Sequence, residues 1–149
     1  FHVVLVEPEI PPNTGSVART CGATGSVLHL VHPLGFDVSE RAVRRAGLDY
    51  WHLVDVVEHA SADAFLAEAP VERLVLFTTE SETAHTAHAF QPGDYLVFGK
   101  ESVGLSETWK TRFPLQQVSI PMPGFVRSLN LSNSVAIGLY EALREQSLC

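Results

Sequence analysis

Short apolar runs alternate with segments of helical character along the chain. The apolar runs are rich in Val, Leu and Ile and predict β-strands. They are His2–Glu7, Val27–His32, Arg73–Thr79, Asp94–Gly99 and Gln117–Pro121. Most of them lack the apolar–polar alternation of a half-exposed strand. This pattern favours a parallel sheet that is covered on both faces.

The segments between these runs predict helices. They are Thr14–Ala23, Ser39–Ala46, Ser61–Ala69, Ser106–Phe113 and Asn130–Glu145. Ser39 and Ser61 are typical helix N-caps, and an acidic residue follows each of them in the first turn. In the last helix, apolar residues recur every four positions and form one stripe, at Leu131, Val135, Leu139 and Leu143. The order of elements predicts one α/β domain over residues 1–149, with a mostly parallel sheet flanked by helices.

Composition restricts the class of protein further. The chain has 149 residues, of which 46% are hydrophobic and 18% charged, enough for one domain to bury a core without staples. Two cysteines, Cys21 and Cys149, exclude a disulfide framework and a cysteine zinc site, and they favour a reducing, cytoplasmic location. No apolar run approaches the roughly 18 residues that span a bilayer. The net charge of −7 argues against general nucleic-acid binding but leaves room for a local basic patch.

Several familiar motifs fail on spacing. The five residues between Gly93 and Gly99 are one too many for a Walker A loop, and Glu101 follows Lys100 where Ser or Thr is needed. No G-x-G-x-x-G follows the first strand, and no G-x-S-x-G is present. His85 and His88 lie three positions apart, but no carboxylate is spaced to join them. We therefore predict no metal site.

Candidate chemistry lies in segments that follow a predicted strand, which we call strand exits. The first of them is Glu7–Arg19. Its prolines fix the backbone, and Asn13 is expected to cap a helix whose first turns present Gly15 and Arg19. Free N–H groups at a helix start and a nearby Arg suit a phosphate. An ordinary capped helix with a surface Arg explains this segment equally well.

Two further exits have the same character. Leu96–Leu105 carries Gly99 and Gly104, which let a ligand approach the backbone. Ile120–Asn133 leads an apolar loop into a helix start with more Ser and Asn residues than capping requires. This surplus suggests hydrogen bonds to a ligand. Ligands of open α/β sheets gather at the carboxyl ends of the strands, so the three exits predict one site.

Taken in order, the stretches PEIPPNTG, RRAGLDYW, FGKESVGL and RSLNLSN resemble the motifs of SPOUT-class RNA 2′-O-methyltransferases of the TrmH/SpoU type. The resemblance covers essentially the whole chain and is strongest to the small TrmL-like branch, which methylates the ribose of the wobble nucleotide (position 34) in tRNA. It implies a C-terminal deep trefoil knot, the cofactor S-adenosyl-L-methionine with S-adenosyl-L-homocysteine as product, and a homodimer with the final helix and the first motif at its interface.

The resemblance also implies roles for individual residues. Arg19, Asn13 and Ser128 are expected near the reacting ribose, with Arg19 reaching toward the partner subunit's cofactor, and Tyr140 matches a position linked to tRNA binding. The expected cofactor-binding residues are Phe77, Thr78, Gly99, Glu101, Ile120, Met122, Ser128 and Asn133. Two departures stand out. Lys100 replaces a frequent Pro, and Gly124-Phe125-Val126 replaces a more polar stretch; both bear on RNA contacts.

One basic cluster offers an RNA-binding surface. Arg41, Arg44 and Arg45 share a helix face by their spacing and are expected to hold the anticodon stem-loop of tRNA; a solvated charged helix face is the simpler alternative. Two other functions remain open. One is the same chemistry on another tRNA position or on rRNA, and the other is a non-catalytic RNA-binding module.

Overall fold

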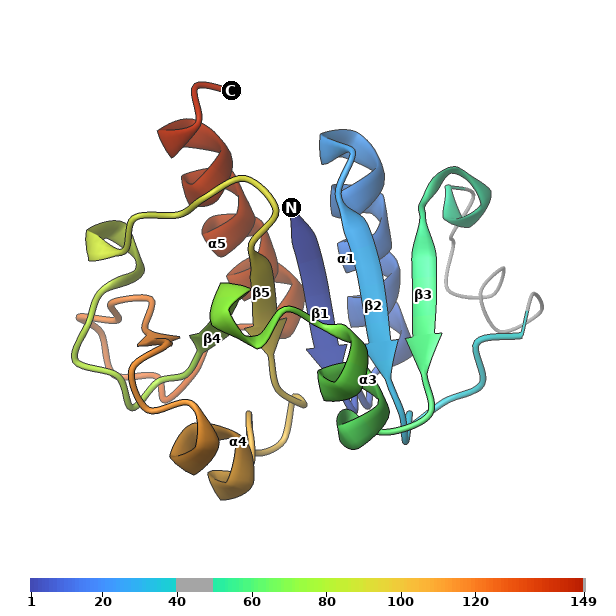
Figure 1. The fold of residues 1–149 in the computed structure, drawn as a ribbon, viewed down its shortest axis with the longest axis horizontal. Helices are drawn as coiled ribbons and strands as arrows, with labels where there is room; N and C mark the ends of the chain where they lie inside the picture. Colours follow the sequence, from blue (N-terminus) through green and yellow to red (C-terminus); the bar gives the residue numbers. More distant parts are fainter. Residues whose placement is uncertain (40–49, 149) are drawn as a thin grey trace.

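The fold is built on a single parallel sheet. The structure is a computed structural model that describes residues 1–39 and 50–148. Six strands lie in the order β3-β2-β1-β5-β4-β6 (Figure 1). They are β1 (His2–Val6), β2 (Val27–Val31), β3 (Val56–His59), β4 (Leu74–Phe77), β5 (Tyr95–Phe98) and β6 (Gln117–Val118). All the strand pairs are parallel. The strand order reverses direction between β1 and β5, which is where open α/β sheets bind ligands.

All the strands predicted from the sequence are present, and the sheet is the parallel α/β arrangement that we expected. The prediction missed β3. This strand lies at the edge of the sheet, and its four residues Val56–His59 include an exposed Glu58. A short edge strand buries too little to produce a continuous apolar run.

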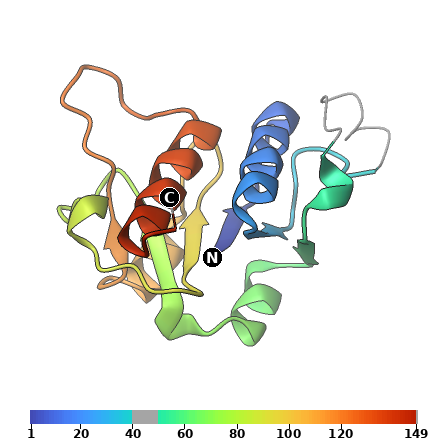
Figure 2. The same ribbon diagram turned by 90° about the horizontal axis from the view of Figure 1, so that it is seen from above.

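Helices cover both faces of the sheet. They are α1 (Pro11–Thr24), α3 (Ala62–Glu68), α4 (Glu107–Arg112) and α5 (Leu131–Glu145). The helices α1 and α5 lie side by side on one face (Figure 2). On the other face, Phe65 of α3 and Trp109 of α4 pack against Val4, Leu76 and Val97. Successive residues of each central strand therefore enter two different cores, which explains why the strands read as continuous apolar runs.

Four of the five predicted helices are present, and one of them begins earlier than expected. The predicted stripe on α5 is buried at all four positions, and Ser61 Oγ accepts a hydrogen bond from the Ala64 amide, as its capping role requires. However, α1 begins at Pro11, three residues earlier than expected, because prolines suit the first turn of a helix, where the amides are unpaired. Of the predicted helix Ser39–Ala46, residues 40–46 lie outside the described residues.

Two further expectations concern membrane-spanning helices and the knot. Among the described residues, no helix is both long enough and apolar enough to cross a bilayer. The trefoil knot implied by the family resemblance stays a prediction.

Candidate functional site

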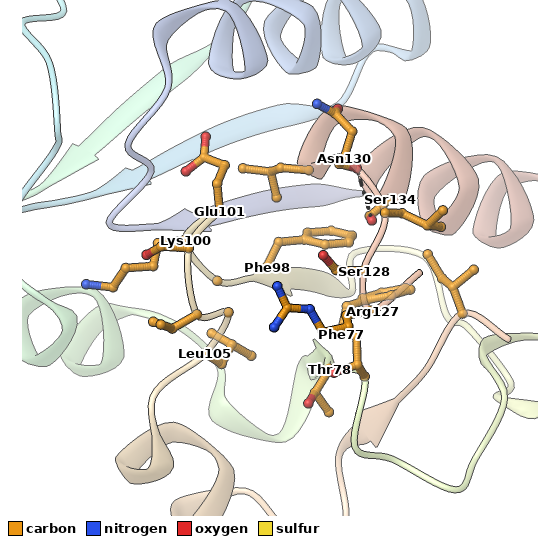
Figure 3. A pocket seen from close by; sticks show the side chains of 18 of the residues that line it. Phe77, Thr78, Phe98, Lys100, Glu101, Leu105, Arg127, Ser128, Asn130 and Ser134 are labelled. Carbon is orange, nitrogen blue, oxygen red and sulfur yellow. Dashed lines mark hydrogen bonds between the residues drawn. The ribbon is translucent and has the colours of Figure 1, made fainter. Parts of the chain in front are cut away.

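A cavity of about 550 Å³ lies at the carboxyl ends of β4, β5 and β6. The described residues that line it include members of all three strand exits singled out in the sequence. They are Ile10 and Asn13 after β1, residues 98–105 at the end of β5 and after it, and Ile120, Met122, residues 127–131 and Ser134 before and within α5 (Figure 3). Residues 77–80, which follow β4, complete the wall together with Lys110 of α4. The three strand exits that the sequence singled out therefore meet at one cavity.

Most of the side chains expected at the cofactor line this cavity. They are Phe77, Thr78, Gly99, Glu101, Ile120, Met122 and Ser128. Asn133 does not line it, because at that helical position its side chain is exposed to solvent, and Ser134, one residue later, faces the cavity instead. Asn13, expected near the ribose, also lies in the wall.

Aromatic rings form the floor of the cavity. The rings of Phe77 and Phe98 stack with their centroids 4.5 Å apart. A Cβ at Gly138 of α5 would lie 2.6 Å from the Phe77 ring, so the absence of a side chain there lets this ring pack directly against the helix. The floor is thus a rigid apolar surface that suits a flat apolar group of a ligand.

Gly99 allows the chain to turn tightly at the cavity. A Cβ at this position would lie 2.0 Å from the carbonyl carbon of Gly104, and the Gly104 amide donates a hydrogen bond of 2.8 Å to the carbonyl oxygen of Lys100. The loop 99–104 therefore folds back on itself because residue 99 has no side chain.

The carboxylate of Glu101 caps α1 from a distant part of the chain. Its Oε2 accepts from the Glu9 amide at 2.7 Å, and its Oε1 accepts from the Ile10 amide and from Asn13 Nδ2, both at 3.1 Å. The expectation that Asn13 caps this helix is therefore wrong, because Ile10 is the N-cap residue and Asn13 lies within the first turn. The negative carboxylate also suits the positive end of the helix dipole.

Glu9, just before α1, in turn binds the loop 99–104, to which Glu101 belongs. Its two carboxylate oxygens accept hydrogen bonds from the amide and the hydroxyl of Ser102, each at 2.9 Å. The β1 exit and the β5 exit are thus joined by reciprocal hydrogen bonds. These bonds fix one wall of the cavity.

Asn130 joins a third segment to this network. Its Nδ2 donates to Asn13 Oδ1 at 2.9 Å, while its Oδ1 caps α5 by accepting from the amides of Ser132 and Asn133 and from the Ser132 hydroxyl. Much of the apparent surplus of Ser and Asn at this helix start is therefore used in capping. Ser128 is the member of the group that faces the cavity without a hydrogen bond to another described residue.

The charged side chains of the wall differ in whether they are paired. Lys100 Nζ lies 2.7 Å from a Glu7 carboxylate oxygen, and Lys110 Nζ lies 2.6 Å from oxygens of Glu80 and Glu107. These carboxylates raise the pKa of both lysines. Arg127 makes no hydrogen bond or ion pair with any other described residue, and its side chain extends toward the middle of the cavity (Figure 3). Its guanidinium is therefore available to an anionic ligand.

Arg19 and Tyr140, for which the family resemblance also implies roles, lie outside the cavity wall. Arg19 is not part of the cavity wall, and its guanidinium lies over the ring of Tyr50, 5.0 Å from the centroid. Tyr140 is 46% exposed on α5. Arg41, Arg44 and Arg45, the predicted RNA-binding cluster, lie outside the described residues. Within the described residues, no group of three His, Cys, Asp or Glu side chains is placed to hold a metal ion.

Comparison with known proteins assigns this arrangement to a family. The model of the SpoU rRNA Methylase family matches residues 1–140. The chain belongs to the SpoU methylase family. Its sequence is 51% identical over 148 residues to a tRNA (cytidine(34)-2′-O)-methyltransferase of Burkholderia pseudomallei, with 97% of this chain and 95% of the relative covered. A protein of the same description from Escherichia coli K12 is 45% identical over 146 residues, with 97% and 93% covered.

Solved structures agree with this assignment. One, described as giving structural insights into the 2-OH methylation of C/U34 on tRNA, has a TM-score of 0.92 and 48% identity, and the match covers 98% of this chain and 95% of that one. The SpoU methyltransferase AviRb of Streptomyces viridochromogenes, in complex with AdoMet, has a TM-score of 0.84 and 26% identity, with 99% of this chain and 58% of that one covered.

Several cavity-lining residues of this SpoU methylase were not predicted as members of the site, among them Asn130, Arg127 and Lys110. Asn130 and Arg127 belong to the polar stretch RSLNLSN. However, the bond of Asn130 to Asn13 and the position of Arg127 in the cavity depend on residues far away in the sequence. Lys110 reaches the cavity from α4 and is only 11% exposed. No local pattern distinguishes such a lysine from one on the surface.

Proposed function

We propose that this chain transfers a methyl group from S-adenosyl-L-methionine to the ribose 2′-hydroxyl of the wobble nucleotide, position 34, in tRNA. The observation that carries the proposal is the meeting of three strand-exit segments around one cavity, in a chain about half identical to tRNA (cytidine(34)-2′-O)-methyltransferases over nearly its full length. The chain would act as one methyltransferase domain over residues 1–149, in the cytoplasm where tRNA is modified.

The residues present fit the cofactor. The cavity volume of about 550 Å³ lies in the range of small-molecule sites. Its stacked rings, Phe77 and Phe98, and the side chains of Ile120 and Met122 suit an adenine, and the hydroxyls of Thr78 and Ser128 suit polar groups of a nucleoside. When bound, S-adenosyl-L-methionine supplies an activated methyl group and leaves as S-adenosyl-L-homocysteine.

Positioning is the main task of the chain's own residues. The Glu101–Asn13–Asn130 network fixes the wall of the cavity, and a fixed wall can hold a hydroxyl in line with the group that reacts with it. The floor of the cavity is apolar, because the stacked rings of Phe77 and Phe98 form it. A site that excludes water favours the loss of charge that accompanies this transfer, because a neutral product needs less solvation than a cation.

The 2′-hydroxyl must also lose its proton. Arg19 stays protonated in a protein, so its role would be to anchor a phosphate and to stabilise the developing alkoxide rather than to act as a base. In one chain Arg19 lies outside the cavity wall. The proposed site therefore requires a homodimer in which the partner subunit's Arg19 approaches the cavity.

RNA binding would draw on Arg41, Arg44, Arg45 and Tyr140. Each phosphate contact contributes to an affinity that falls with salt concentration. Replacing the three arginines with Ala is expected to weaken tRNA binding and to lower its salt dependence. Unchanged binding would remove them from the proposal.

Calorimetry and methyl transfer together test the function. The purified chain is titrated with S-adenosyl-L-homocysteine and then assayed for methyl transfer to tRNA from cells that lack this modification, with the methylated nucleotide located by mass spectrometry. Saturable binding and a methylated ribose at position 34 would support the proposal. Methylation only at another position or in rRNA would replace the substrate, and an absence of cofactor binding would favour the non-catalytic alternative.

A further inference from the structure

The large apolar side chain of Phe125 is fully exposed to solvent. Its relative exposure is 107%, and Val126 beside it is 65% exposed. Both belong to residues 121–128, the substrate loop as we name it, which connects β6 with α5 and stands away from the body of the chain (Figure 2). In the described structure, no hydrogen bond joins this loop to the rest of the chain. A single exposed apolar side chain is common on protein surfaces, but this one lies between two residues of the cavity wall, Met122 and Arg127.

The loop forms the rim of the cavity on both sides of Phe125. Met122 before it and Arg127 and Ser128 after it line the cavity. Since a residue extends the chain by at most about 3.6 Å, the backbone of Phe125 lies within about 8 Å of that of Arg127. The backbone of Phe125 is therefore close to the cavity, while its exposed ring is not part of the wall and stays accessible to a ligand.

The chemistry at this rim suits one nucleotide. An exposed aromatic ring offers a stacking surface to an unpaired base, which is how proteins hold bases of single-stranded loops. Two residues away, the unpaired guanidinium of Arg127 offers hydrogen bonds and charge to a phosphate. The base and the phosphate of one nucleotide would thus find matching groups on the same loop at the edge of the cavity.

A second copy of this chain fits the loop less well. The homodimer interface is expected at the final helix and the first motif, and an eight-residue loop with one large ring adds little to the roughly 800 Å² that each partner of a stable contact buries. An apolar contact between proteins would also leave the charge of Arg127 without a partner. The combination of a lone ring and a free cation favours RNA.

We propose that Phe125 stacks on the base of the nucleotide whose ribose is methylated and so determines its placement over the cavity. This inference rests on the proposed function and assigns to Phe125 the binding of the base. Because stacking is present in both the ground state and the transition state, its loss is expected to raise KM and to leave kcat unchanged.

The test compares Phe125→Ala, Phe125→Leu and Phe125→Trp with the unchanged chain, using a synthetic anticodon stem-loop and S-adenosyl-L-homocysteine as probes. Ala and Leu are expected to raise the Kd of the stem-loop and the KM by about 10- to 100-fold, with kcat and cofactor affinity unchanged. Trp is expected to restore both, and its fluorescence is expected to be quenched when the stem-loop binds. Leu115→Ala serves as the matched control, because Leu115 is 96% exposed but is not part of the cavity wall.

Several results would overturn the inference. A Leu variant equal to the unchanged chain would mean that no stacking occurs, and an Ala variant with normal KM would mean that the ring does not touch the substrate. If sedimentation velocity shows that Phe125→Ala changes the oligomeric state, then the ring contacts a second copy instead. These outcomes leave methyl transfer by the unchanged chain intact; if the unchanged chain neither binds nor methylates the stem-loop, the proposed function fails as well.

Discussion

Asn130 Nδ2 donates a hydrogen bond of 2.9 Å to Asn13 Oδ1, which joins two side chains 117 positions apart in the sequence. Each partner has a second task. Asn130 Oδ1 caps α5, and Asn13 Nδ2 donates to Glu101. The starts of α1 and α5 and the loop after β5 therefore depend on one continuous network beside the cavity.

Substitutions at Asn130 can separate its hydrogen bond to Asn13 from its capping of α5. Asn130→Asp and Asn130→Ser both keep a good N-cap, but Asp places a carboxylate against Asn13 Oδ1 and Ser is too short to reach it. Both variants are expected to keep α5 and to lose about tenfold in affinity for S-adenosyl-L-homocysteine, measured by calorimetry. Asn130→Ala is expected to lose about 1 kcal/mol of stability in addition. Normal cofactor affinity in the Asp variant would show that the bridge does not shape the site.

Loss of the Glu101 carboxylate is expected to destabilise the fold. In Glu101→Ala, two backbone amides and Asn13 Nδ2 lose their acceptor. We expect a decrease of about 2–3 kcal/mol in the free energy of unfolding, measured by urea denaturation. Glu82→Ala is the matched control, since Glu82 is exposed and its replacement should stay within about 0.5 kcal/mol. Equal stability of the two variants would contradict the capping role.

A methyl group at Gly99 is expected to open the loop after β5. The added Cβ would overlap the Gly104 carbonyl carbon at 2.0 Å, whereas a Cβ at Gly124 meets nothing within 4 Å. Gly99→Ala should therefore cost about 3 kcal/mol or more and reduce cofactor binding, and Gly124→Ala should change neither. Urea denaturation and calorimetry of the pair check this. A Gly99→Ala variant that behaves like the Gly124→Ala control would refute it.

Buried histidines predict how stability depends on pH. His2 Nδ1 lies 2.9 Å from His29 Nε2, and His29 Nδ1 lies 2.9 Å from His59 Nε2. Burial, with the neighbouring rings, lowers the pKa of His29 to about 4, against about 6.5 in the unfolded chain. The unfolded chain thus binds the proton first. The contribution is complete above pH 6.5 and is lost progressively toward pH 4, by up to about 3 kcal/mol.

Urea denaturation at several pH values measures this dependence. His29→Leu is expected to flatten the stability profile between pH 4 and pH 6.5, because the titrating group is gone. His52→Asn, a change at an exposed position, should keep the profile of the unchanged chain. A profile for His29→Leu as steep as that of the unchanged chain would assign the pH dependence to other groups.

The sequence predicted the parts of this structure that depend on local pattern. Apolar runs gave five of the strands, the four-residue repeat gave the buried face of α5, and glycines and prolines at strand exits marked the cavity. Distant partners could not be predicted in this way. The cap of α1 comes from Glu101, which lies 91 positions after Ile10, so Asn13 was the best local candidate and was wrong. Arg19 shares a motif with Asn13 but faces away from the cavity, because helix phase separates them.

The reciprocal bonds between Glu101 and α1, and between Glu9 and Ser102, have a consequence for turnover. The loop 99–104 cannot swing outward without uncapping a helix, whereas the substrate loop on the opposite rim is held only at its two ends. The opening past Phe125 and Arg127, on the side from which we propose that the RNA arrives, is therefore the one that can widen with the fewest broken hydrogen bonds. Departure of the methylated RNA and exchange of S-adenosyl-L-homocysteine would then share one gate and follow an order, with the RNA leaving first.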